Sequence, residues 1–369
     1  MAEKYPFTNA EELKKNVSGV DINFEPENIE SGNRRAAAYV KDLVSEEVWQ
    51  LMIDHFNDTD NYNQPNQENE NYLRLDNLVE NMQFPLSNFT FFFHFIWLQV
   101  RIANDTVKLS DKQNTPYKYQ EDEAKDQLLE AAHEGISDLI DFLNKEATQW
   151  SDWLPETEYA TADVVKYGGN YYTANSDFTS GTEFTPANWT SKPAGEVIFK
   201  EWTNSLQYMQ LKNEVFANYK EFDQYFGINR SAAFYVKART IIHEVVVDHV
   251  YPRTGTLPNE KVTADATLLS KIKRYVAYSA MSIATLRMDY YLLPGSIRKN
   301  IDSEYTRKSL TEAKNVRESL SVALGNKADE YLNDIDLYLA QKDKTPDDKP
   351  YDKFKSTVTS DDKFSSMGI

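Results

Sequence analysis

The spacing of apolar residues between Tyr117 and Trp153 predicts a long helix with one side suited to burial. Apolar side chains recur there at three-, four- and five-residue steps, which lays a stripe along a helix of about eight turns. The stripe consists of Ala124, Leu128, Ala131, Ile136, Leu139, Leu143 and Ala147. The opposite side is acidic, and Glu121 and Lys125 stand in the favourable i,i+4 order. No acidic pair there has catalytic spacing, so we interpret the segment as a packed structural helix.

Helical and alternating patterns also precede this helix. Residues 34–56 carry apolar positions at helical spacing and predict one helix, and residues 73–82 predict a shorter one. Apolar residues alternate over 98–102 and again over 107–109, on either side of the turn-forming pair Asn104-Asp105. This pattern is typical of a β-hairpin.

The second half of the chain repeats the first at a fixed offset. The segments RRAAAYVK from Arg34 and RSAAFYVK from Arg230 agree at six of eight positions and lie 196 residues apart. The same offset places DLIDFL, from Asp138, on DIDLYL, from Asp334. Two matches at one offset predict a duplicated helical unit.

The second copy therefore has helices of its own. Residues 230–250 predict its first helix, and Asp265 is the expected N-cap of the next, which Leu293-Pro294-Gly295 would end. A last helical region covers residues 304–340, with a break expected near Gly325-Asn326.

Between the copies, residues 158–195 are rich in Tyr, Thr, Gly and Asn and lack helical periodicity. Short alternating segments flank Gly168-Gly169, which predicts a hairpin within a small all-β insert. The pattern D-V-V-x-Y-x-G-x-x-Y-x-A over residues 163–174, followed by Gly181, Pro186 and Trp189, resembles small chitin-binding-type carbohydrate modules of bacterial hydrolases and phage fibres.

That resemblance implies that exposed aromatic rings of the insert stack on sugars. The rings it nominates for glycan contact are Tyr171, Phe178 and Trp189. The alternative is that the same rings form the core of a module that is too small to have another one.

Composition narrows the functional classes. The chain has 369 residues, 41% of them apolar, and no cysteine, so its folding depends on packing rather than on disulfides. A net charge of −18 argues against tight binding of nucleic acid. An acidic surface would, however, let DNA slide past without binding to it. The start lacks the apolar segment of a signal peptide, and the longest apolar run, residues 89–98, is too short to cross a bilayer. We expect neither secretion nor a membrane.

No motif predicts catalysis, a cofactor or a metal. His243-Glu244 resembles the start of an H-E-x-x-H zinc motif, but Val247 stands where the second histidine should be. Asp58 opens an EF-hand-like stretch that lacks the central Gly and has Asn69 where calcium binding needs Glu. Neither a Gly-rich phosphate loop nor a G-x-S-x-G elbow occurs, so we predict that the protein is not an enzyme.

The helical part resembles a second family. Residues 8–44, 118–153, 228–253 and 279–300 look like an uncharacterised family of structural virion proteins, encoded beside capsid genes in tailed phages and prophages of Bacteroidota, crAss-like phages included. The resemblance implies a head-to-tail connector or neck ring subunit. Such a subunit would form a homo-oligomeric ring between the portal and tail proteins of the virion, around the passing DNA, after assembly in the host cytoplasm. The alternative is a glycan-binding surface or decoration protein that acts through the insert.

The sequence thus predicts a mainly α protein built from a duplicated helical-bundle unit with a small β-hairpin, plus an inserted small all-β module. Its expected parts are an N-terminal arm (1–30), helical unit 1 (31–155), the β module (156–195), helical unit 2 (196–340) and an extended C-terminal tail (341–369). Both end segments have too little apolar surface to fold alone, and we expect them to become ordered only against another chain. In the tail, the expected assembly anchors are Phe354 and Phe364.

Overall fold

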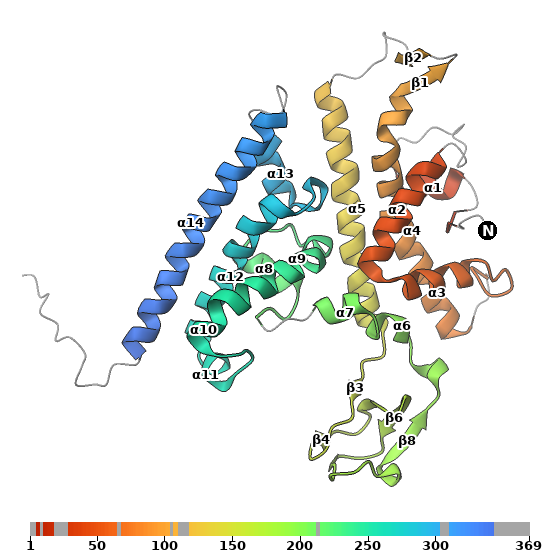
Figure 1. The fold of residues 1–369 in the computed structure, drawn as a ribbon. Coiled ribbons are helices and arrows are strands. Elements are labelled where there is room, and N and C mark those ends of the chain that lie inside the picture. Colours follow the sequence, from red (N-terminus) through yellow and green to blue (C-terminus); the bar gives the residue numbers. More distant parts are fainter. Residues whose placement is uncertain are drawn as a thin grey trace, which may run out of the picture.

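The computed structural model confirms a mainly α fold with a small β region (Figure 1). It describes residues 5–7, 10–17, 29–64, 68–103, 106–109, 118–211, 215–302 and 310–342. One large apolar core runs through both helical units, and the β module has a separate small core.

Helical unit 1 is organised around its two longest helices. The helix α4 packs against α2 on one side and α5 on the other. The helices of this unit are α1 (Ala10–Asn16), α2 (Glu30–Val44), α3 (Glu46–Phe56), α4 (Glu70–Gln99) and α5 (Lys118–Glu146). The buried side chains of α5 include Ile136, Leu139 and Leu143, as its apolar stripe predicts.

The single helix predicted over residues 34–56 is wrong, because the structure has two helices there. Ser45 separates α2 from α3 with a φ of 88°, a backbone conformation that no helix contains. Its hydroxyl accepts a hydrogen bond from the N–H of Val48 at 3.2 Å and so caps α3. A buried serine in this conformation therefore ends α2 and begins α3.

The short helix predicted over residues 73–82 is also wrong in its extent. The helix α4 has 30 residues and continues through Pro85 and the aromatic run as far as Gln99. Proline removes one backbone hydrogen bond, but the burial of Leu86 and Phe89 between neighbouring helices outweighs that loss. The hairpin prediction is confirmed, since β1 (Val100–Ala103) pairs antiparallel with β2 (Thr106–Leu109).

The described part of the N-terminal arm packs on its own chain. Leu13 of α1 is fully buried, and the side chain of Gln83 on α4 donates a hydrogen bond to the carbonyl of Pro6 at 2.7 Å. Lys15 and Glu80 form an ion pair at 2.7 Å. These contacts correct the expectation that this arm is ordered only by another chain, at least for residues 5–7 and 10–17.

Helical unit 2 has the same central arrangement, in which α12 packs against α9 and α14. Asp265 caps α12 as predicted, accepting the N–H of Leu268 at 2.9 Å. Its helices are α6 (Lys200–Thr203), α7 (Leu206–Leu211), α8 (Tyr219–Tyr225), α9 (Ala232–Val245), α10 (Tyr251–Thr254), α11 (Glu260–Thr263), α12 (Ala266–Arg287), α13 (Gly295–Asp302) and α14 (Leu310–Lys342). The predicted helix over 230–250 begins later, at Ala232, and its last turn, Val246–Val250, is a π-helix.

The predicted break at Gly325 is wrong, because α14 is continuous. A Cβ atom on Gly325 would lie 3.3 Å from the hydroxyl oxygen of Ser282, so the glycine serves the close approach of α14 to α12. Two helix ends agree with the repeat offset. The start of α12 and the end of α14 each lie 196 residues after the corresponding ends of α4 and α5. The duplicated unit therefore stays a prediction that the helix bounds support.

The β module projects from the helical body at the end opposite the β1–β2 hairpin (Figure 1). Its main sheet has the order β3-β5-β6-β8, and β4 pairs with β7. The predicted hairpin at Gly168-Gly169 is confirmed, with positive φ values of 57° and 82° that suit a tight two-residue turn. The strands are β3 (Ser151–Asp152), β4 (Glu158–Tyr159), β5 (Val164–Tyr167), β6 (Asn170–Ala174), β7 (Phe178–Thr179) and β8 (Trp189–Lys192).

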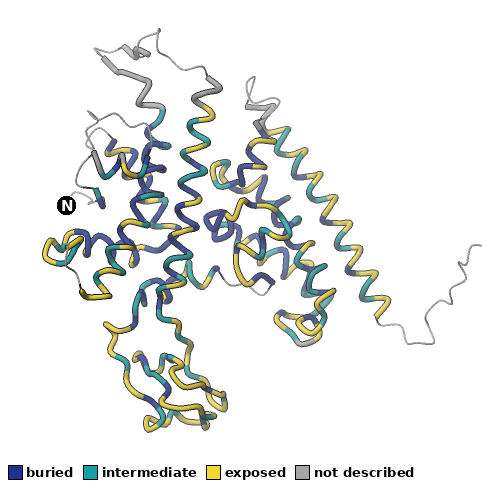
Figure 2. The backbone as a smooth tube through the Cα atoms, turned by 180° about the vertical axis from the view of Figure 1, so that it is seen from behind, coloured by how far each residue is buried: buried dark blue, intermediate teal, exposed yellow. Residues whose placement is uncertain are grey.

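The two helical units meet where α5 of unit 1 packs against α9 of unit 2. Both helices have buried residues, drawn dark blue in Figure 2. The hydroxyl of Ser137 on α5 donates to the carbonyl of Arg230 at 3.0 Å and accepts the N–H of Ala232 at 3.1 Å. One serine of unit 1 thus satisfies backbone groups at the start of α9.

Candidate functional site

The β module buries two of the three rings nominated for glycan contact. Tyr171 and Trp189 are buried, and only Phe178 is partly accessible. Tyr171 faces the helical body, where its hydroxyl accepts a hydrogen bond from the side chain of Asn204 at 3.1 Å. Trp189 packs among other rings, with Phe178 at a centroid distance of 5.2 Å. Two of the three nominated rings are therefore buried, and of these two Trp189 belongs to the core of the module.

A different pair of rings reaches the surface of the module. Tyr167 is 42% exposed and stacks on Phe184 with centroids 4.2 Å apart and planes at 10°. Trp153 meets both rings edge-on, at 5.3 Å from Tyr167 and 5.8 Å from Phe184. Sequence reasoning missed this pair, because the alternation of a strand does not reveal which of its two faces a small module leaves uncovered.

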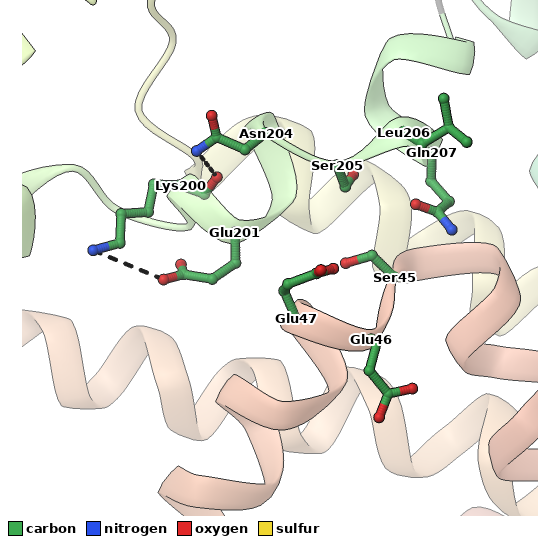
Figure 3. A pocket seen from close by; sticks show the side chains of 9 residues that line it. All are labelled: Ser45, Glu46, Glu47, Lys200, Glu201, Asn204, Ser205, Leu206 and Gln207. Carbon is green, nitrogen blue, oxygen red and sulfur yellow. Dashed lines mark hydrogen bonds and ion pairs between the residues drawn. The ribbon is translucent and has the colours of Figure 1, made fainter. Parts of the chain in front are cut away.

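A hollow of about 500 Å³ lies between the start of α3 and the α6–α7 segment (Figure 3). It is lined by Ser45, Glu46, Glu47, Lys200, Glu201, Asn204, Ser205, Leu206 and Gln207. The acidic groups here do not form a metal site. Within the described residues, no group of three or more His, Cys, Asp or Glu side chains is placed to hold an ion.

A second pocket, of about 400 Å³, lies at the junction of the two helical units. It is bordered by α5, by the turn between α8 and α9, and by the start of α13. Arg298, Tyr219 and His133 are its most buried charged or titratable residues, with exposures of 1%, 3% and 8%. We call this site the junction pocket. It is the candidate site with the most unusual electrostatics in the described part of the chain.

The guanidinium of Arg298 lacks close partners. Its Nη2 atom is 3.8 Å from Asp126 and 3.7 Å from Glu130, which is longer than a hydrogen bond, and its Nε and Nη1 atoms have no hydrogen-bond partner. Burial, and then the charge of Arg298, lowers the pKa of His133 to about 3, so this imidazole is neutral. Its Nε2 atom also has no hydrogen-bond partner.

The acidic side of the junction pocket lies along α5. Tyr219 donates a hydrogen bond to Asp141 at 2.7 Å, and Lys220 forms an ion pair with the same carboxylate at 2.6 Å. Burial raises the pKa of Asp138, and the neighbouring charge of Asp141 raises it further, while Lys220 opposes both. The carboxyl of Asp138 therefore lacks a compensating cation of its own.

The turn that borders the junction pocket has an unusual backbone. Asn229 and Arg230 are consecutive residues with φ values of 54° and 52°, in the left-handed region. A single carboxylate oxygen of Asp223 holds the turn, accepting the N–H groups of Ile228 at 2.7 Å and Arg230 at 3.1 Å. Consecutive left-handed residues outside glycine are uncommon and cluster at binding sites.

Large apolar side chains remain exposed on several of the described helices, α7 and α14 among them. Leu206 and Met209 lie one turn apart on α7, and Val322 and Leu337 lie on α14 with exposures of 61% and 62%. Among the described residues, no helix is both long enough and apolar enough to cross a membrane. The assembly anchors Phe354 and Phe364 lie outside the described residues, so their role stays a prediction.

Comparison with known families gives one match. Residues 39–163 and 232–360 match the family described as "Family of unknown function (DUF6712)". The chain belongs to this family. The matched segments comprise most of both helical units, together with the first part of the β module. No curated protein and no solved structure matches the chain.

The sequence did not single out the residues of the junction pocket. Pro294-Gly295 was interpreted only as the end of a helix, whereas in the structure Gly295 begins α13 and places Arg298 one turn later. His133 and Arg298 are 165 residues apart in the chain, and neither belongs to a motif. An arginine one turn into a short helix is the only local signal, and it is too common to identify a buried charge.

Proposed function

We propose that this protein is a structural virion protein, a head-to-tail connector or neck ring subunit that links portal to tail and forms part of the DNA passage. The resemblance of its helical segments to virion proteins supports this function. A rigid two-unit helical body suits such a role, because a load-bearing subunit needs one continuous core rather than an open cleft. Its site of action would be the virion.

The observation that carries the proposal is the outer side of α14. This helix of 33 residues is about 50 Å long and packs on α12, at the edge of the molecule (Figure 1). Val322 and Leu337 lie about 60° apart around the helix axis, and both side chains are exposed on the side of α14 that does not pack on α12. They lie about 22 Å apart along the axis, and we take them as the apolar contacts of an elongated surface that another subunit covers.

Light scattering and electron microscopy of the purified chain test the proposal. We expect ring-shaped oligomers, and we expect the double variant Val322→Lys/Leu337→Lys to be monomeric with unchanged helical circular dichroism, because buried unpaired charges oppose association. The matched control is Asn77→Lys/Gln127→Lys, which adds the same charge at exposed polar positions of α4 and α5, away from α14, and should still assemble. Wild-type protein that stays monomeric, or a double variant that assembles normally, contradicts the proposal.

Binding of DNA gives a further test. With a net charge of −18, the subunit should not retain duplex DNA at physiological salt, since release of counterions needs clustered cationic side chains. Submicromolar and steeply salt-dependent retention would contradict a passive passage. A gel-shift titration at two salt concentrations distinguishes these outcomes.

The second candidate is a glycan-binding surface or virion decoration protein that acts through the β module. The exposed, stacked ring of Tyr167 favours it, because a flat aromatic face suits the apolar face of a sugar. Retention of the chain on chitin or cell-wall glycans, lost in Tyr167→Ala and kept in the control Tyr208→Ala on the helical body, would support this function. Equal retention of both variants would exclude a role for this ring.

A further inference from the structure

Four buried polar atoms without hydrogen-bond partners lie on Arg298 or near it. They are Nε and Nη1 of Arg298, Nε2 of His133 and the hydroxyl of Tyr39. The charge of Arg298 influences the pKa of both His133 and Tyr39, and the ring of Phe89 contacts both of these side chains, at 5.7 Å and 4.7 Å. A buried polar atom without a hydrogen-bond partner destabilises the fold, so such a cluster is expected to have an occupant.

The chemistry of the cluster indicates what that occupant is. Arg298 and Tyr39 offer N–H and O–H donors, and the guanidinium is permanently charged. A carboxylate is the small group that matches a guanidinium in shape and charge, since it accepts two parallel hydrogen bonds. The nearest carboxylates of the chain, on Asp126 and Glu130, stay at 3.8 Å and 3.7 Å and make no such bonds.

Glu130 lies beside Arg298, and both side chains line the junction pocket. A Cβ atom on Gly295 would lie 2.7 Å from the Oε1 atom of Glu130 and 3.7 Å from the Nη2 atom of Arg298. The side chain of Glu130 is 42% exposed and also pairs with Lys299 at 3.5 Å. When another carboxylate takes its place beside Arg298, the side chain of Glu130 can therefore turn toward solvent and remain paired with Lys299.

The other end of the junction pocket has the opposite character. Glu134 and Asp138 line it without an ion pair in the described structure, whereas Asp141 is paired with Lys220. A ligand with negative charge alone would be repelled by these carboxylates. A ligand that carries a carboxylate at one end and an ammonium group at the other meets a complementary charge at each end.

We propose that the junction pocket binds a small zwitterion, with its carboxylate on Arg298 and its ammonium group beside Asp138 and Glu134. The volume of about 400 Å³ accommodates a ligand of amino-acid to dipeptide size. Because α5 belongs to unit 1 and α13 to unit 2, the bound ligand bridges the two units. Binding therefore stabilises their arrangement.

Calorimetric titration of the full chain at constant ionic strength tests the proposal. The probes are the straight ω-amino acids glycine, 4-aminobutyrate and 6-aminohexanoate, with acetate and butylamine as half-ligands that carry one charge each. We expect saturable binding of at least one ω-amino acid and weaker binding of both half-ligands. No saturable binding of any ω-amino acid at millimolar concentration overturns the proposal.

Variants then locate the site. Glu130→Gln removes the carboxylate that competes for Arg298 and should tighten binding about tenfold, whereas Arg298→Gln should weaken it by at least about tenfold. Glu123→Gln, an exposed change on the same helix, is the matched control and should bind as the wild type does. If Arg298→Gln does not fold, the comparison of Glu130→Gln with Glu123→Gln still tests whether the ligand binds at Arg298. Equal affinity of these two variants overturns the assignment to Arg298.

Discussion

Removal of the β module should leave the helical body folded. The core of the module, built on Val165 and Trp189, is separate from the core of the helices. Two side-chain hydrogen bonds connect it to the body through Asn204, which accepts from Lys166 at 3.0 Å and donates to Tyr171 at 3.1 Å. At about 0.5–1.5 kcal/mol each, their loss should lower the free energy of unfolding by about 1–3 kcal/mol.

The deletion is designed to keep the base of the module. Thr148 and Ile198 close that base with two hydrogen bonds, of 3.0 Å between backbone groups and 2.9 Å to the threonine hydroxyl. Residues 153–192 are therefore replaced with a Gly/Ser linker. The outer strands β3 and β8 are three strand spacings apart, about 14 Å. A flexible linker of about seven residues spans that distance without strain.

Circular dichroism and thermal unfolding measure the outcome. We expect unchanged helical signal per helical residue and a melting temperature lower by less than about 12 °C, at about 2–4 °C per kcal/mol for a domain of this size. Asn204→Ala in the full chain removes both hydrogen bonds, together with the 2.7 Å bond from Asn204 to the carbonyl of Lys200, and should lower the melting temperature within the same limit. Trp202→Ala, which empties a fully buried site, should cost about 3–5 kcal/mol. Loss of cooperative melting in the deletion would refute the separation of the two cores.

Three further changes test the packing of the helices by urea unfolding. Gly135→Ala should destabilise by about 1–3 kcal/mol, although alanine favours helices, because the new Cβ would lie 2.6 Å from a ring carbon of Phe84; a more stable variant would contradict this. His133, with a pKa of about 3, binds its proton in the unfolded chain near pH 6.5, so stability falls as pH decreases between these values. From pH 7 to 5, His133→Leu should lose about 2 kcal/mol less than wild type, and equal losses would refute a buried neutral imidazole. Ser137→Ala should cost about 1–3 kcal/mol by leaving the N–H of Ala232 unpaired, whereas an unchanged midpoint would show that water replaces the hydroxyl.

Local sequence signals determined the elements with strong periodicity or specific turn chemistry. The apolar stripe of α5, the N-cap at Asp265 and the Gly168-Gly169 turn are each specified by residues within a few positions of one another. The 196-residue offset likewise came from the sequence, and helix ends at Glu146 and Lys342 agree with it. The physical reason is that hydrogen bonding within a helix or a tight turn involves only near neighbours.

Tertiary structure determined the continuity of two helices, the burial of individual rings and the junction pocket, which local sequence rules do not predict correctly. Pro85 and Gly325 are helix breakers by propensity, yet packing on neighbouring helices keeps α4 and α14 continuous. Tertiary structure also decided which rings of the β module are buried: Tyr171 lies against the helical body, whereas Tyr167 is at the surface. The junction pocket depends wholly on tertiary structure, because its charges come from helices that are distant in the chain. Electrostatic interactions of these charges are stronger when the side chains are buried away from water, and only the complete fold determines which side chains are buried.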